Sequence, residues 1–304
     1  MPARRRKVRI KSKLNLKKLL VYVILGIVFI SLIGFTKLSQ KNWNGEDKLT
    51  LVIRGEENVN IAIFDPKQAE IINIIIPDNT EVDVAEQKGI YKIQNIWELG
   101  ENSKLGGNLL SRSVTKHFKL PVYLWADKYA LGFLESNPTS LAKALFYPYS
   151  TNLSLGDKFG LALFSLSVKN PKRSDIDFIE SDYVKEKELL DGTTGYVTMG
   201  DLPPGISSLF AMSEMSENIY RIMIRDATGQ FGLSEEVTKI LEVLGGKVVS
   251  IVKEKEADGV CELRGKNQET LEVIAKLLPC SVKKDSATNI DIEVYLGKDF
   301  GERY

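Results

Sequence analysis

The chain has 304 residues, of which 43% are hydrophobic and 27% charged, a composition typical of globular proteins large enough for two domains. The net charge of +1 conceals an asymmetry, because residues 1–37 carry ten basic and no acidic side chains. The remaining residues carry 31 basic and 40 acidic side chains, a net charge of −9, which argues against nucleic acid as a partner.

An uncharged run of 18 residues, 19–36, follows a basic segment over residues 1–18. As a helix it would span about 27 Å, close to the roughly 30 Å of a bilayer core. The basic segment predicts a cytoplasmic N-terminus that contacts membrane lipid, with a stalk over 37–49 and the main body outside the cell. A cleaved signal peptide and a buried core helix are the alternatives. The run is long for a signal peptide, and no cleavage site built on alanine follows it. It also lacks the amphipathic pattern of a core helix, so we favour a single-pass anchor.

Residues 50–200 alternate strand and helix signals, which predicts an α/β domain. Five isoleucines fall within residues 70–76, so that strand is apolar on both faces and is expected to be central in its sheet. The predicted elements are a strand over 59–64, a turn over 65–68, a strand over 70–76, a helix over 105–118 and a strand over 121–126. Residues 136–215 give no clear pattern, and 201–218 is predicted to be a linker.

Residues 219–304 predict a second, small α/β domain with two helices on a mixed sheet. Ser234 is expected to cap the first helix and Asn267 the second. The last strand, over 290–296, is expected to close the sheet. The other predicted strands are 220–225, 247–252, 260–263 and a short one that begins at 281–282.

Cys261 and Cys280 are the only cysteines. The predicted topology exports both to an oxidising space, where a disulfide is stable. One lies in a predicted strand and the other just beyond the following helix, so the two could be neighbours. We expect a disulfide, with two free cysteines as the alternative.

The second domain resembles the LytR C-terminal domain of bacterial cell-envelope proteins. The segments that carry the resemblance are Arg221–Gly229, Phe231–Ser234, the pair Gly245-Gly246 and the closing Val294–Phe300. The resemblance implies a non-catalytic module that acts in the cell envelope.

The first domain resembles a degenerate copy of the catalytic LytR–CpsA–Psr (LCP) domain. The matching segments are Asp65-Pro66, Ile74–Thr80, Tyr91–Asn95, Gly106-Gly107 and Leu120–Asp127. The resemblance implies transfer of glycopolymer from a polyprenyl-pyrophosphate carrier to peptidoglycan, with arginines on the pyrophosphate and acidic residues on a metal. This chain departs from that pattern, because Asp78-Asn79 replaces the arginine of the family's Pro-Arg-Asp-Thr segment. Lys172–Asp175 is only a fragment of the arginine-rich helix.

The resemblance and the strand ends suggest a small set of site residues. Asp65, Asp78 and Arg112 are the catalytic candidates, and Asp65, Asp78 and Asp127 are candidate ligands for Mg²⁺. Capping of turns by the carboxylates and a solvated arginine are the alternatives. His117 is the only histidine, which argues against histidine metal clusters and Ser-His-Asp triads.

Three function classes follow. We favour a membrane-anchored, non-catalytic envelope protein that binds or scaffolds wall glycopolymer, polyprenyl-linked glycan or an envelope protein. The alternatives are a divergent phosphotransferase and an envelope-linked regulator. No cofactor is expected, except Mg²⁺ for the phosphotransferase. The enzyme would be favoured if one cleft held Arg112 and Arg173 beside Asp65 and Asp78. The binding protein would be favoured if these four residues were scattered over the structure.

Overall fold

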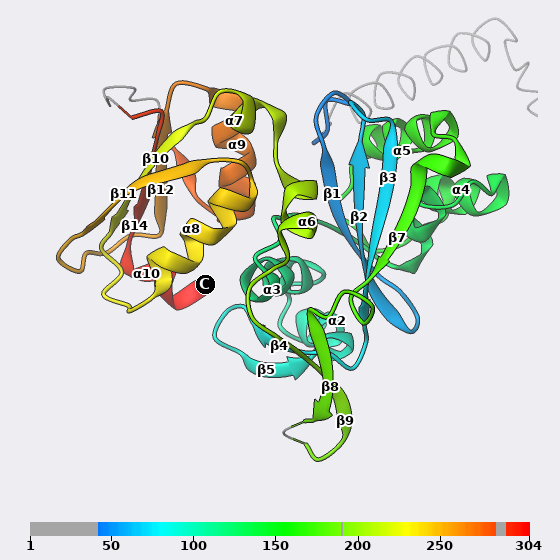
Figure 1. Ribbon diagram of the computed structural model, residues 1–304, viewed down its shortest axis with the longest axis horizontal. Helices are drawn as coiled ribbons and strands as arrows, with labels where there is room; N and C mark the ends of the chain where they lie inside the picture. The colour runs from blue at the N-terminus through cyan, green and yellow to red at the C-terminus, as the bar shows by residue number, and fades with distance from the viewer. Residues whose placement is uncertain (1–41, 190, 284–289) are drawn as a thin grey trace, which may run out of the picture.

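The computed structural model describes residues 42–189, 191–283 and 290–304. The predicted membrane segment over 19–36 lies outside these residues, and no helix within them is long and apolar enough to cross a membrane. The described chain forms two α/β units, each built on a five-stranded sheet (Figure 1). The expected α/β fold class is therefore confirmed for the described residues.

The first sheet has the strand order β6-β1-β2-β3-β7. Its strands are β1 (Leu49–Arg54), β2 (Asn58–Asp65), β3 (Glu70–Pro77), β6 (Leu124–Ala126) and β7 (Arg173–Asp177). Neighbours β1, β2 and β3 are antiparallel, whereas β6 runs parallel to β1 and β7 parallel to β3. The isoleucine-rich β3 thus lies inside the sheet, as its two apolar faces predict.

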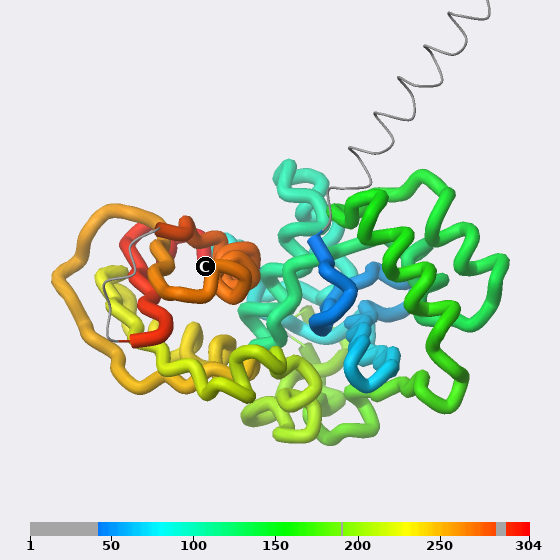
Figure 2. Tube along the Cα trace, turned by 90° about the horizontal axis from the view of Figure 1, so that it is seen from above, coloured from blue at the N-terminus to red at the C-terminus, as the bar shows by residue number. Residues whose placement is uncertain are grey.

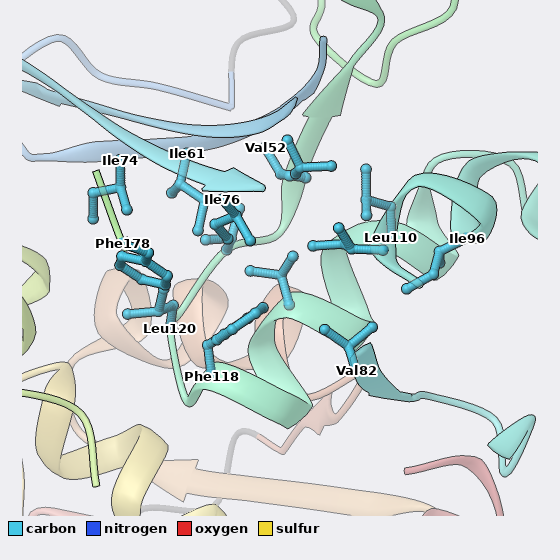
Figure 3. Packing of buried hydrophobic residues seen from close by; sticks show 14 of the residues in the cluster. Val52, Ile61, Ile74, Ile76, Val82, Ile96, Leu110, Phe118, Leu120 and Phe178 are labelled. Carbon is cyan, nitrogen blue, oxygen red and sulfur yellow. The ribbon is translucent and has the colours of Figure 1, made fainter. Parts of the chain in front are cut away.

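Helices α2 (Ile93–Asn102) and α3 (Asn108–Phe118) cover one face of this sheet. Figure 3 shows Ile61, Ile74 and Ile76 of the sheet packed with Leu110 and Phe118. Two hairpins border this core: β4 (Glu81–Val84) with β5 (Gly89–Lys92), and β8 (Val184–Glu188) with β9 (Thr194–Thr198).

The opposite face is covered by η1 (Lys128–Phe133), α4 (Pro138–Phe146) and α5 (Leu155–Ser167). Asp157, which is 1% exposed, forms a capping box with Ser154 at the start of α5. Its carboxylate also accepts hydrogen bonds from the backbone N–H and side-chain amide of Asn42, at 2.8 and 3.0 Å, and from the N–H of Trp43, at 3.0 Å. These contacts fix the start of the described chain to α5.

Short helices join the two units: α6 (Pro204–Ser207), η3 (Ser208–Phe210) and α7 (Ser213–Glu217). Ile206 and Phe210 are buried in the core of the first unit, whereas Met215 is buried in the core of the second. Figure 2 shows the two units side by side, with this segment between them. The connection is therefore packed against both units.

The second sheet has the strand order β11-β10-β14-β12-β13. Its elements are β10 (Arg221–Asp226), β11 (Lys247–Lys253), β12 (Cys261–Gly265), β13 (Ser281–Val282) and β14 (Ile292–Leu296), with helices α8 (Leu233–Val243), α9 (Gln268–Leu277) and α10 (Lys298–Arg303). The sheet is mixed, because β14 is parallel to β10 and antiparallel to β12. The strand expected to close the sheet therefore lies at its centre.

The two predicted helix caps have different outcomes. Asn267 caps α9 as expected, and its side chain accepts a hydrogen bond from the Thr270 N–H at 3.1 Å. The prediction for Ser234 is wrong, because α8 begins at Leu233 after Gly232, whose φ of 82° suits glycine. Ser234 is instead buried in the first turn, where its hydroxyl accepts a hydrogen bond from Lys253 Nζ at 2.8 Å.

The predicted disulfide between Cys261 and Cys280 is confirmed, with a Cα–Cα separation of 4.5 Å. It joins β12 to the chain that follows α9, and Cys261 is buried against the core of the second unit. The bond therefore fixes α9 on the sheet beside β13.

We predict that replacing both cysteines by serine lowers the free energy of unfolding of the second unit by about 3 kcal/mol, because the bond closes a loop of 19 residues. Urea denaturation of the full chain measures the change, and reduction of the wild-type protein should reproduce it. An unchanged urea midpoint in both experiments would show that the bond does not stabilise the fold.

Candidate functional site

A polar cleft of about 560 Å³ lies at one edge of the first sheet. Strands β1, β3 and β6 run in the same direction and all end there, since β2 is antiparallel to both β1 and β3. Ligands of α/β proteins commonly bind beyond the carboxyl ends of strands. The polar residues that line the cleft are Arg54, Glu56, Asn58, Asp78, Gln94, Asn95, Glu98, Asp127 and Lys128.

Arg54 reaches the cleft because β1 ends in a tight turn. The N–H of Gly55 donates to the Asn58 carbonyl at 2.8 Å, and a Cβ on Gly55 would collide with that same oxygen. The Arg54 guanidinium carbon lies 5.7 Å from the ring centroid of Trp97, at cation–π distance. The side chain is exposed, so the aromatic contact orients a cation that stays accessible to a ligand.

Lys128 supplies the second cation. Its Nζ lies 2.7 Å from Glu56 Oε1, and this hydrogen bond lowers the pKa of Glu56 and raises the pKa of Lys128. The preceding residue, Asp127, caps η1 by accepting from the Lys128 N–H at 2.7 Å. Both members of the Lys128–Glu56 pair are exposed, so water screens the pair and a ligand can displace it.

The opposite wall comes from Asp78 and the first turns of α2. The Gln94 N–H donates to the Asp78 carbonyl at 3.1 Å, which holds the start of α2 against the end of β3. Gln94, Asn95 and Glu98 are exposed along the cleft. The lining thus combines two cations with four carboxylates and three side-chain amides.

The structure brings two of the four candidate site residues together. Asp78 and Asp127 line the same cleft. Asp65 lies at the opposite edge of the sheet, because it pairs with Glu70 at the other end of β2 and β3. It is 5% exposed, forms an ion pair with Lys48 at 3.3 Å and accepts from the Gln68 N–H at 3.1 Å, as a turn-capping residue does.

The two arginines weighed from the sequence lie elsewhere. Arg112 forms an ion pair with Glu86 and lines a small cavity that faces the second unit. Arg173 begins β7 and donates to the Leu134 carbonyl at 2.7 Å and to carbonyls at the end of α5. Neither lines the cleft. Among the described residues, no group of three or more His, Cys, Asp or Glu side chains is placed to hold a metal ion.

Arg54 and Lys128 were not among the residues predicted from the sequence. Arg54 is the last residue of β1, and Lys128 follows the end of β6 by two residues. Strand β1 was not among the predicted strands. The signal was present as the apolar segment 49–53 followed by Arg54-Gly55. A strand followed by a charged residue and a glycine indicates a side chain placed at a sheet edge.

A second cavity, of about 350 Å³, lies between the two units. Tyr123 of the first unit lines it, and burial raises the pKa of its phenol to about 12. Lys276 of α9 lies 5.7 Å from the Tyr123 ring centroid, and Lys119 contacts Glu236 at 3.1 Å. These contacts join the units through charged and aromatic groups.

His117 has a structural position on α3. Its Nδ1 accepts from the Asp83 N–H at 3.1 Å, and its Nε2 lies 3.1 Å from the Thr198 hydroxyl. Burial, assisted by the nearby Lys119 charge, lowers the pKa of His117 to about 4. The neutral ring therefore joins α3 to β4 and β9, and the accepting Nδ1 requires that it stay unprotonated.

We predict that His117 makes stability depend on pH between 6.5 and about 4. The unfolded chain binds the proton at the higher pH, so the stabilisation is complete above 6.5 and falls by about 3 kcal/mol as the pH drops towards 4. Urea midpoints at pH 7 and pH 5 measure the loss. His117→Gln should show a smaller decrease, and equal decreases in the two proteins would contradict the assignment.

Comparisons with known proteins give one family match. Residues 219–300 match the family described as LytR cell envelope-related transcriptional attenuator, which confirms the resemblance of the second unit. No curated protein matches the chain.

Several solved structures are similar to part of the chain. The crystal structure of B. subtilis TagT is 14% identical, covers 53% of this chain and 88% of its own, and has a TM-score of 0.39. The crystal structure of B. subtilis TagV is 10% identical, covers 67% of this chain and 100% of its own, and has a TM-score of 0.40. A structure of TagT bound to LIIa-WTA is 13% identical, covers 53% of this chain and 88% of its own, and has a TM-score of 0.38.

Proposed function

We propose that the chain is a membrane-anchored envelope protein that binds wall glycan. The match of residues 219–300 to the LytR cell envelope-related family supports this proposal. The binding site is the polar cleft, and the first unit acts as an LCP-like domain without glycan transfer. The observation that carries the proposal is the mixture of charges in the cleft.

The charge balance of the cleft disfavours a pyrophosphate ligand. Arg54 and Lys128 face the carboxylates of Glu56, Asp78, Glu98 and Asp127, a net charge of −2. Lys128 already pairs with Glu56, which leaves Arg54 as the main cation. A pyrophosphate needs several fixed cations, and bidentate guanidinium groups are the usual clamp. Transfer also needs cations around the displaced oxygen.

The same lining suits the uncharged part of a glycan. Carboxylates accept hydrogen bonds from sugar hydroxyls, and the amides of Asn58, Gln94 and Asn95 both donate and accept. Arg54 can hold one phosphate or carboxylate along the polymer. Wall glycopolymer therefore fits the cleft better than the pyrophosphate end of a lipid carrier does.

We predict that Asp78→Ala weakens binding of soluble wall glycopolymer fragments about tenfold, the effect of losing one hydrogen bond to a charged group. Arg54→Ala should weaken binding of anionic fragments more than neutral ones. Isothermal titration calorimetry measures both. The control is Glu217→Ala, which removes an exposed carboxylate outside the cleft. Equal affinities for all variants would exclude the cleft as the site.

One observation favours the alternative phosphotransferase. Asp78 and Asp127 line one cleft with Arg54, so two carboxylates could supply oxygen ligands to Mg²⁺ beside a cation. Mg²⁺ would neutralise phosphate charge there. Incubation of the full chain with a polyprenyl-pyrophosphate glycan, Mg²⁺ and wall acceptor fragments tests this activity. Transfer that disappears in Asp78→Ala would replace the binding proposal by an enzyme.

The proposed topology places the basic segment 1–18 in the cytoplasm and residues 37–304 outside. It is supported by the nine basic residues within 1–18, the acidic body and the family match. We predict that protease added to intact spheroplasts digests the body and leaves a small membrane-bound fragment. Complete protection of residues 50–304 would contradict the topology.

A further inference from the structure

Helix α5 carries an exposed apolar stripe. Leu155, Phe159, Leu163 and Leu166 are 46%, 36%, 68% and 65% exposed. Phe146 at the end of α4 is 73% exposed, and its ring centroid lies 6.3 Å from that of Phe159. Contiguous exposed apolar groups of this size are unusual on a soluble surface and commonly mark an interaction site.

The stripe is narrow and free of charge. At about 100° per residue, its four α5 positions fall within roughly 80° of the helix circumference. They extend over roughly 16 Å of helix. The only charged residues of α5, Asp157 and Lys158, are both buried. Two exposed lysines flank the stripe in the sequence: Lys143 of α4, three residues before Phe146, and Lys169, three residues after Leu166. An apolar face bordered by lysines is typical of helices that lie in a membrane interface.

The path of the chain places this helix beside the anchor. Asn42 and Trp43 are fixed to Asp157 in the first turn of α5, and the Trp43 ring contacts Phe164 edge-on with centroids 5.8 Å apart. Only five residues separate Thr36, the end of the uncharged run, from Asn42. Even fully extended, that connection spans only about 20 Å. A membrane helix over 19–36 would therefore hold α5 close to the bilayer surface.

We propose that the exposed stripe of α5, with Phe146, lies in the interfacial region of the phospholipid bilayer and fixes the orientation of the body on the membrane. This inference rests on the proposed anchor, because the anchor brings the stripe within reach of lipid. Figure 1 shows α4 and α5 on the side of the first sheet away from the second unit.

The test uses the full chain in liposomes of phosphatidylcholine and phosphatidylglycerol that contain a diazirine-bearing phospholipid. After illumination, lipid adducts are mapped by mass spectrometry. The peptide over 155–166 should carry severalfold more adducts than β11, which exposes Val249, Ile251 and Val252 and serves as the internal control. Leu163→Glu with Leu166→Glu should reduce the α5 adducts to the β11 level, with an unchanged circular dichroism spectrum.

The outcomes separate this inference from the anchor. Adducts on residues 19–36 but none above the β11 level on α5 would overturn the inference and keep the anchor. No adducts on either segment would overturn both. The wild-type protein could also form a dimer that shields α5 from lipid and that the double variant converts to a monomer. This result would show that the stripe binds a second copy of the chain, and it would overturn the inference.

Discussion

The burial of both faces of the antiparallel ribbon β1–β2–β3 is the constraint on which the first unit depends. In β2 every residue from Val59 to Asp65 is buried. Each face must therefore be covered, and the chain supplies α2 and α3 on one side and η1, α4 and α5 on the other. Burial of this kind is the main stabilising contribution to such a unit. It also places the ends of β1, β3 and β6 at one edge, where polar side chains can reach solvent.

The acidic residues divide according to burial. Asp65, Asp157 and Asp226 are at most 5% exposed, and each accepts hydrogen bonds from nearby backbone N–H groups. Such carboxylates are already satisfied, and removing them would leave donors unpaired. The acids of the cleft are more exposed, and Asp78 and Glu98 can turn towards a ligand. A candidate acid in a sequence can therefore be either a structural cap or a ligand group, and burial distinguishes the two.

Sequence patterns predicted the elements whose apolar residues repeat regularly. Strands β2 and β3 follow from their isoleucines, and α8 and α9 follow from stripes such as Val237, Ile240 and Leu241. Helices α4 and α5 were not predicted, because exposed apolar residues such as Leu163 and Leu166 obscure the contrast between the buried and the exposed face of the helix. Of the cleft, only Asp78 and Asp127 were anticipated. The sequence marks Arg54 as the end of a strand, but its contact with Trp97 of α2 depends on packing, which local patterns do not encode.

Because β14 is the central strand, the second sheet can form only after the end of the chain has been synthesised. Ile222 of β10 pairs with Ile292 of β14 across 70 residues of chain, and β12 pairs with the other side of β14. Until residues 292–296 have been synthesised, β10 and β12 each present an unpaired edge with no neighbour between them. Contacts of such long sequence separation form slowly, and open edges invite pairing with other chains. A ribosome or translocation channel that releases this unit gradually would therefore hold it in an aggregation-prone state until its last strand emerges.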